Sequence, residues 1–396
     1  MLRVERKIWN WILKNPIILL VIAGTILSLL LRYWAREFKS GDMDIIVKWH
    51  REMAKNGGFK ALSQQTGDYG IFFQFFLALS CYLPFSPLIN SKLVLLPFDY
   101  IQAIAIGLIV KEITKSGFKG ALAYVIAILF PVVLLNSAFW GQCESMISGF
   151  GLLAFYFLLK KKPILAFIAL GLAFAFKLQA VFFIPFFLFY YVYKKEFSFL
   201  HLLLIPATFL VTALPGILMG RGVKEAFDIV LNQKDQYLRL SYNYPSFWGL
   251  MFPNMAEGFY DELDSMMIYL TLTTLAVGMI LLFRLKKPLS DADLVKVMAL
   301  MLYVSPLMLP NMHERYDYMA IMACLIIAFL DARTIPFLLI FLQINLRTYG
   351  DYLFGEYVHY EVNWVALSVA NIACFTAYVW NCASGIRKRE LGESTL

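Results

Sequence analysis

The sequence predicts an all-α protein that crosses a membrane many times, and two observations lead to this fold class. Of the 396 residues, 60% are hydrophobic and only 16% are charged, whereas soluble globular domains carry about 25% charged residues. A chain this apolar cannot bury its hydrophobic surface against itself in water. Apolar segments that suit membrane spans also recur along the chain, with polar turns between them.

About twelve of these segments are predicted to span the membrane as helices, since a span needs about 20 residues, or fewer where flanking side chains reach the interface. Segment 71–83 is short and aromatic, and we interpret it as an interfacial or re-entrant helix. Residues 349–363 are predicted to form a loop. The predicted spans are 16–31, 92–110, 121–135, 145–159, 164–176, 180–193, 199–218, 266–283, 294–309, 318–330, 335–346 and 364–382.

Basic residues predict how the spans are oriented. The clusters at 160–162, 194–195 and 387–389 all fall on one side of the membrane if 71–83 does not span, and cytoplasmic loops are those that carry such clusters. We therefore predict a multi-pass protein of the cell membrane with both termini in the cytoplasm. Its two large extracytoplasmic loops would be 32–91 and 219–265. If segment 71–83 spanned fully, everything after it would invert.

The remaining composition disfavours several other classes of protein. The net charge of +8 is mostly a topology signal, so no nucleic-acid partner is predicted. The five cysteines are scattered and form no cluster with the four histidines, so the sequence predicts neither a metal site nor a disulfide framework. No internal repeat is obvious, and the inverted repeats common in transporters are therefore not supported.

The most charged long segment, residues 40–69, follows the first predicted span. Ser40 is typical of a helix start, and apolar side chains then recur at helical spacing until the glycines at 57–58. The segment predicts an amphipathic helix on the membrane surface, with Asp42 and Asp44 at its N-terminal end. The alternative is a solvated connection, although plain connections between spans are usually shorter and less aromatic.

Polar side chains gather at the outer ends of several predicted spans, where ionisable groups are expensive and by default mark function. The cytoplasmic side has no counterpart, because it holds only runs of Lys and Arg. The pattern predicts one pocket open to the outside rather than a channel through the bilayer. Its candidate residues are Asp99, Trp140, Gln142, Glu144, Lys177, Gln179, His313, Glu314, Arg315 and Tyr316.

These residue types suit group transfer from a lipid phosphate to a hydroxyl. Lys177, Arg315 and His313 would supply positive charge and hydrogen-bond donors for a phosphate at the membrane surface. Asp42 and Asp44 would supply a base that activates the acceptor hydroxyl.

Aromatic side chains, among them Trp140 and Trp248, would supply the flat faces that hold sugars. Purely structural roles stay open for several of the polar candidates. Lys177 can be an end-cap of its span, Glu144 can cap the following helix, and 313–315 can be an ordinary short loop.

Motifs around these positions resemble those of the GT-C glycosyltransferases. Residues 41–44, GDMD, with Trp49 are similar to the first outside loop of eukaryotic glucosyltransferases that extend lipid-linked oligosaccharides, which starts Gly-Asp-aromatic-Glu. Asp68 and Tyr69 resemble their downstream Asp-Tyr-Pro-Pro, although Gly-Ile replaces the two prolines here.

Three further motifs resemble bacterial mannosyltransferase-like relatives. Residues 136–145, NSAFWGQCES, look like their Trp-Gly-Gln-x-Asp turn, with Glu144 as the final acid. Residues 176–179, FKLQ, resemble their Lys-x-Gln, and 312–316, MHERY, resemble their His-Glu-Arg motif. The motifs occur in the family's order and on one predicted face.

The resemblance implies an inverting hexosyltransferase that takes its sugar from a polyprenyl-phosphate monosaccharide and needs no metal or other cofactor. It assigns Asp42 as general base, and His313, Arg315 and Lys177 to the donor phosphate. The residues that it places at the sugar or lipid pocket are Asp44, Asp68, Tyr69, Trp140, Gln142, Glu144, Gln179, Glu314, Tyr316 and Trp248.

The resemblance also implies a single GT-C domain over residues 1–396. Residues 1–260 would form the catalytic module, and 266–396 would form more variable helices that contribute the outside loop 311–317. The acceptor would be an extracytoplasmic glycan or glycolipid of the cell envelope. The composition suggests a prokaryote, which favours undecaprenyl phosphate as the lipid, with an archaeal dolichyl phosphate as the alternative.

Two other functions stay open. An envelope-polysaccharide polymerase or ligase would move whole glycans from a lipid pyrophosphate and would use an outside loop with arginines, for which Arg221 and Arg239 are candidates. A lipid or glycan transporter would need polar access from both faces of the membrane.

Overall fold

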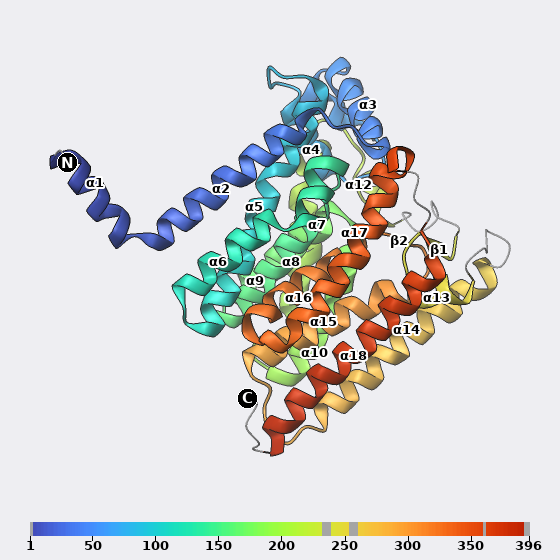
Figure 1. Ribbon diagram of the computed structural model, residues 1–396. Helices are drawn as coiled ribbons and strands as arrows, with labels where there is room; N and C mark the ends of the chain where they lie inside the picture. The colour runs from blue at the N-terminus through green and yellow to red at the C-terminus, as the bar shows by residue number, and fades with distance from the viewer. Residues whose placement is uncertain (1–2, 232–238, 253–259, 359–361, 392–396) are drawn as a thin grey trace.

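The computed structural model describes residues 3–231, 239–252, 260–358 and 362–391, and it is almost entirely helical. The helices form one bundle, with α3 and the β1–β2 pair at one end and the C-terminus at the other (Figure 1). The N-terminal half consists of α1 (Arg3–Lys14), α2 (Pro16–Trp34), α3 (Gly41–Lys55), α4 (Ile71–Ser80), α5 (Pro87–Thr114), α6 (Gly117–Leu129), α7 (Pro131–Val133), the π-helix η3 (Leu134–Trp140), α8 (Glu144–Leu159), α9 (Pro163–Phe176) and α10 (Ile184–Lys194).

The C-terminal half completes the bundle. It consists of α11 (Leu204–Leu218), α12 (Val223–Leu231), β1 (Ser241–Tyr242), α13 (Phe247–Met251), α14 (Tyr260–Phe283), α15 (Asp291–Met308), β2 (Met312–His313), α16 (Tyr318–Leu330), α17 (Ile335–Val358) and α18 (Trp364–Leu391). One continuous apolar core joins the two halves and runs from Met43 to Ile386.

The structure confirms an all-α polytopic membrane protein. Each predicted span is helical, although 121–135, 180–193 and 199–218 are each divided between consecutive helical segments. Among the described residues, five helices are long and apolar enough to cross a bilayer, or six if the bent α6–η3 pair counts as one span. The number twelve therefore stays a prediction. Helix α4 has 10 residues and is about 15 Å long, half the thickness of a hydrocarbon core of about 30 Å.

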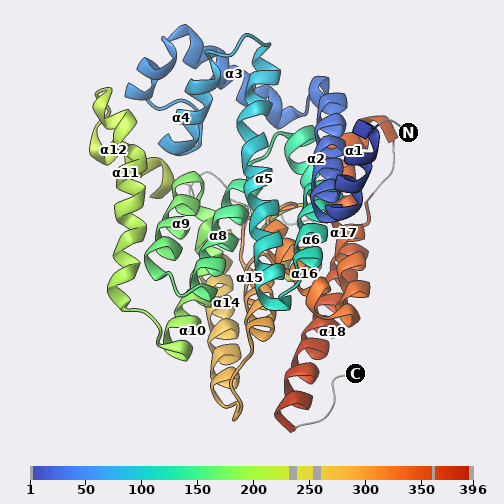
Figure 2. The ribbon, with the colours of Figure 1, turned by 90° about the vertical axis from the view of Figure 1, so that its left-hand side faces the viewer.

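Small residues allow the closest helix contact. A Cβ added to Gly107 on α5 would lie 2.8 Å from the Gly120 carbonyl on α6, and the reverse contact has the same length. Glycine is therefore required at both positions, as is common where membrane helices approach closely. Figure 2 shows α5 beside α6, with α3 and α4 across the end of the bundle.

The second predicted loop is tied to the first by Arg221. Its guanidinium donates to the Leu62 carbonyl (2.9 Å), Gln65 Oε1 (2.9 Å) and Gln74 Oε1 (3.0 Å), and also to the Gln64 carbonyl. These contacts hold the chain before α12 against α4 and the segment that precedes it. Residues 232–238 and 253–259 of this loop lie outside the described part of the chain.

Two short parallel strands join the second loop to the loop between α15 and α16. Ser241 pairs with Met312, and Tyr242 pairs with His313. The predicted loop at 349–363 is different in the structure, because α17 continues to Val358. This extension adds about three helical turns to α17, at the end of the bundle that carries α3.

Candidate active site

Asp42 lies in the first turn of α3, and the local sequence fixes its position. The Ser40 hydroxyl accepts a hydrogen bond from Met43 N (3.1 Å), which caps the helix, and donates to the Trp140 carbonyl (2.6 Å). At Gly141 the backbone φ is +83°, and a Cβ would clash with the Met43 sulfur. Glycine is therefore required where the start of α3 lies against the end of η3.

The Asp42 carboxylate accepts three hydrogen bonds. Oδ2 accepts from Trp140 Nε1 (2.8 Å) and Gln142 Nε2 (2.5 Å). Oδ1 accepts from the Tyr352 hydroxyl on α17 (2.7 Å), and the Tyr352 ring stacks on Trp140 with a centroid separation of 4.3 Å. Since a carboxylate offers about four acceptor positions, one position on Oδ1 is left for a substrate hydroxyl.

Arg315 is the centre of a buried charge cluster beside Asp42. Its guanidinium nitrogens lie 2.7 Å from Glu314, 3.3 Å from Glu144 and 3.8 Å from Asp42. Lys177 Nζ lies 3.2 Å from the same Glu144 oxygen. Burial disfavours the charged form of Arg315, but the neighbouring carboxylates outweigh burial and raise its pKa well above the usual value. Two cations are thus held close together by Glu144.

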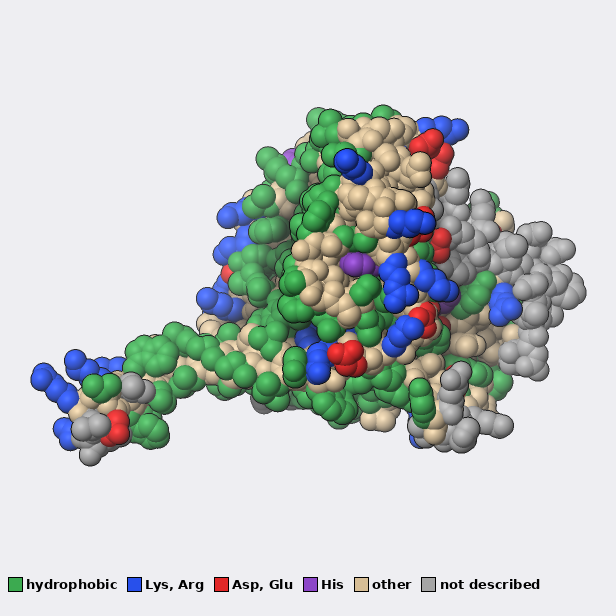
Figure 3. Space-filling view, turned by 90° about the horizontal axis from the view of Figure 1, so that it is seen from above, with side chains coloured by type: hydrophobic (Ala, Val, Ile, Leu, Met, Phe, Trp, Pro, Cys, Tyr) green, Lys and Arg blue, Asp and Glu red, His purple; other side chains and the backbone are tan. Residues whose placement is uncertain are grey.

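A small cavity of about 80 Å³ opens between these groups. Figure 3 shows interspersed acidic and basic side chains on this end of the molecule. The volume is well below the roughly 300–1,000 Å³ of a typical ligand pocket, so a sugar must widen the cavity as it enters. The lining residues are Asp42, Ile45, Ile46, Trp49, Asp68, Tyr69, Gln142, Lys177, Arg315 and Tyr316.

A second cavity of about 250 Å³ shares Tyr316 with the first. Its wall is mainly apolar and includes Leu178, Phe182 and Met312. Leu178 directly follows Lys177, so the apolar cavity begins where the charge cluster ends. A polar chamber beside an apolar one suits a ligand that carries a polar head on a hydrocarbon chain.

A comparison with known families shows the class of this protein. The sequence model of glycosyltransferase family 87 matches residues 69–310, more than half of the chain. The chain belongs to glycosyltransferase family 87. It is therefore a membrane glycosyltransferase of the GT-C type, and the resemblance to this class is confirmed. A search of curated proteins finds no match. The matched range contains Tyr69, Gln142 and Lys177, whereas Asp42 and Arg315 lie outside it.

In this family 87 chain, His313 lies at the edge of the charge cluster, outside the cavity lining. Its ring stacks on Tyr242 with a centroid separation of 4.6 Å. Burial, assisted by Arg315 and Lys177, lowers the pKa of His313 to about 2. Burial therefore disfavours the positive charge expected of His313, and its role at the donor phosphate stays a prediction.

Three other predicted pocket residues lie away from Asp42. Asp44 forms an ion pair with Lys39 on an exposed face, and Gln179 lines the apolar cavity. Trp248 is only 4% exposed and donates from Nε1 to the Met308 carbonyl (2.5 Å). The structure corrects the expectation for Trp248, which packs inside the protein instead of lining a sugar-binding wall.

Asp99, the polar candidate in α5, is also structural. It is fully buried, lies 2.8 Å from Arg32 and accepts a hydrogen bond from the Ser137 hydroxyl. This network joins α2 and α5 to η3, the π-helix that ends at Trp140. Asp99 thus supports the segment that contacts Asp42, without lining the cavity itself.

Tyr352 is the site residue that sequence reasoning missed. It contacts both Asp42 and Trp140, but it follows an apolar helix and sits in a stretch predicted as loop. A weak signal was present, since Tyr349 and Tyr352 are three residues apart and would share a face if the helix continued.

Proposed function

We propose that this glycosyltransferase moves one hexose from a polyprenyl-phosphate monosaccharide to an acceptor hydroxyl, with inversion and without a metal. The observation that carries the proposal is the placement of the Asp42 carboxylate opposite Arg315 and Lys177 on the wall of one cavity. A base for the acceptor and cations for a leaving phosphate are the two requirements of such a transfer.

The proposed step uses these groups in sequence. The acceptor hydroxyl donates to Asp42 Oδ1 and attacks the anomeric carbon of the donor as its proton passes to the carboxylate. The bond between that carbon and the phosphate oxygen breaks, and the electron pair stays on the phosphate. Arg315 and Lys177 stabilise the resulting negative charge.

Asp42 is held in place at the start of α3 by three hydrogen bonds to its carboxylate. A phosphate leaving group needs little help from the nucleophile, so orientation of the hydroxyl with late proton transfer is sufficient.

The neighbouring apolar cavity supports a lipid-linked donor. With the phosphate at Lys177, the first isoprene units would lie along Leu178 and Phe182. In the predicted orientation the reaction takes place on the extracytoplasmic side, undecaprenyl phosphate is the favoured lipid, and the acceptor is a glycan or glycolipid of the cell envelope.

Two carboxylates on one helix provide a matched test. We expect Asp42→Asn to lower turnover at least a hundredfold while donor binding is kept, since general-base catalysis contributes about 10²–10⁴-fold. Asp44→Asn should leave turnover within about twofold, because an exposed ion pair contributes little. Near-normal turnover in Asp42→Asn would contradict the role of Asp42.

A further inference from the structure

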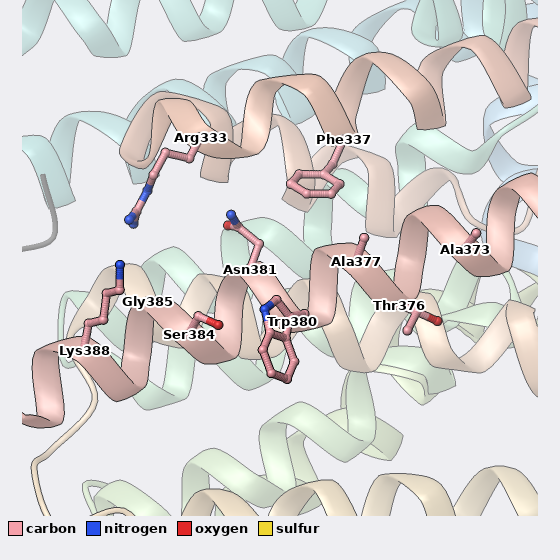
Figure 4. Close-up of a pocket in the computed structure, with 10 residues that line it drawn as sticks. All are labelled: Arg333, Phe337, Ala373, Thr376, Ala377, Trp380, Asn381, Ser384, Gly385 and Lys388. Carbon is pink, nitrogen blue, oxygen red and sulfur yellow. The ribbon is translucent and has the colours of Figure 1, made fainter.

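A large cleft lies at the opposite end of the bundle, between α17 and α18. It has a volume of about 1,060 Å³, which is ample for a lipid head group and part of an acyl chain. Figure 4 shows Arg333 and Phe337 on one side of it, with Asn381 and Lys388 of α18 extending toward them from the other. This cleft is distinct from the candidate active site, which shares none of its lining residues.

Three cations converge on one end of this cleft. Arg333 and Lys388 extend toward each other from the two walls (Figure 4). A Cβ added to Gly385 would lie 3.6 Å from Arg333 Nη2 and 3.7 Å from Lys296 Nζ, so both of these groups lie beside the bare backbone of Gly385.

One carboxylate balances this group. Asp331 accepts hydrogen bonds from Lys296 Nζ (2.9 Å) and from Arg333 Nε and Nη2 (2.8 Å each). No Asp or Glu lines the cleft, and Lys388 makes no ion pair within the described residues. Three positive charges against one negative charge leave a cationic end to the cleft.

Small side chains line the rest of the cleft. Ala373, Ala377 and Ser384 of α18 form one wall, and Phe337 of α17 lies on the other. Trp380 is 76% exposed beside the cleft, which is typical of the membrane interface. A hydrocarbon chain can therefore lie along α18 while its polar head reaches the cations.

We propose that this cleft binds an anionic glycerophospholipid. The phosphate lies between Arg333 and Lys388, and one acyl chain passes Phe337 and continues along Ala377 and Ala373 (Figure 4). Basic pockets between membrane helices bind anionic head groups, because each Lys or Arg near the membrane surface contributes to the attraction. A zwitterionic lipid brings its own cation to the same place and is disfavoured.

The test is lipid binding by the full-length protein in detergent, measured by native mass spectrometry. Phosphatidylglycerol and phosphatidylcholine with identical acyl chains are titrated separately. We expect phosphatidylglycerol to bind more tightly, and Lys388→Gln to weaken its binding about fivefold, the equivalent of about 1 kcal/mol per cation. Gly385→Leu, which fills the cleft, should reduce binding further.

Arg387→Gln is the matched control. It removes the same charge one residue earlier on α18, but Arg387 lines a different cleft beside α14 and α15. We expect it to leave phosphatidylglycerol binding unchanged. Equal binding of the two lipids, or equal losses in Lys388→Gln and Arg387→Gln, would overturn the proposal. Neither exposed side chain supports the fold, and the test does not depend on transferase activity.

Discussion

Two regions at the same end of the bundle each contain a buried arginine, but the two side chains have different partners. Arg315 is surrounded by carboxylates, namely Asp42, Glu144 and Glu314, and it lines the cavity. Arg221 donates only to neutral oxygens of the first loop, such as the Leu62 carbonyl, and lines no part of the cavity.

The difference shows that burial of a charge does not by itself mark a binding site. The neutral oxygens occupy the hydrogen-bond donors of Arg221, so this arginine braces the two loops against each other. Its binding to a glycan pyrophosphate would break that brace, which disfavours the polymerase or ligase. Trp140 and Trp248 differ in the same way, because Trp140 donates to Asp42 and Trp248 to a backbone carbonyl.

Of the substitutions that test this comparison, Arg315→Lys should have the largest effect on activity. Lysine keeps the charge but cannot contact Glu144, Glu314 and a phosphate at once. We expect kcat/KM for the donor to fall about a hundredfold, equivalent to about 3 kcal/mol. Steady-state kinetics with a lipid-phosphate sugar measures this. An unchanged kcat/KM would remove Arg315 from the donor site.

Arg221→Met should lower the stability of the protein and leave catalysis unchanged. The substitution leaves buried oxygens of the first loop without donors, and we expect unfolding in detergent to become easier by about 2 kcal/mol. The KM of the folded fraction should stay the same. A large rise in KM at normal stability would show that Arg221 binds substrate.

Tyr352→Phe tests whether the missed residue positions Asp42. The ring and its stacking on Trp140 are kept, while the hydrogen bond to Oδ1 is lost. A hydrogen bond to a charged group contributes about 1.5–3 kcal/mol, so kcat should fall about tenfold with little change in donor KM. Equal turnover by the Tyr352→Phe variant and the unmodified protein would show that Tyr352 does not position Asp42.

Asp317 should give the smallest effect, a pH dependence of stability. Asn345 Nδ2 donates to its Oδ2 (3.0 Å) and joins the Arg315 loop to α17. Burial raises the pKa of Asp317 to about 7, so the folded state holds a proton that the unfolded state releases. Stability should therefore decrease as pH rises, by about 1 kcal/mol between pH 6 and 7. The Asp317→Asn variant should lack this decrease. If the stability of the variant and of the unmodified protein changed equally with pH, the raised pKa of Asp317 would be contradicted.

The sequence predicted the membrane fold because apolar composition and segment length depend on local residues alone. It also predicted the start of α3, since Ser40 is a typical cap. The convergence of Asp42, Gln142 and Arg315 followed from motif order and predicted topology, although they are far apart in the chain.

Other features depend on packing that no local pattern shows. Tyr352 reaches Asp42 only because α17 continues past its apolar segment. The lowered pKa of His313 follows from burial beside two cations. Trp248 is buried because α13 packs it against Leu240 and Met267 and because its indole donates to the carbonyl of Met308, 60 positions away.

The most direct test of the proposed function is release of free polyprenyl phosphate by the purified protein in the presence of EDTA. Polyprenyl-phosphate monosaccharides are supplied as donors, with a membrane glycolipid extract as the source of acceptor. A lipid-pyrophosphate oligosaccharide is tested in parallel. We predict release from a monophosphate donor that EDTA does not reduce and that Asp42→Asn abolishes. Transfer from the pyrophosphate substrate alone, or complete dependence on a divalent cation, would contradict the account.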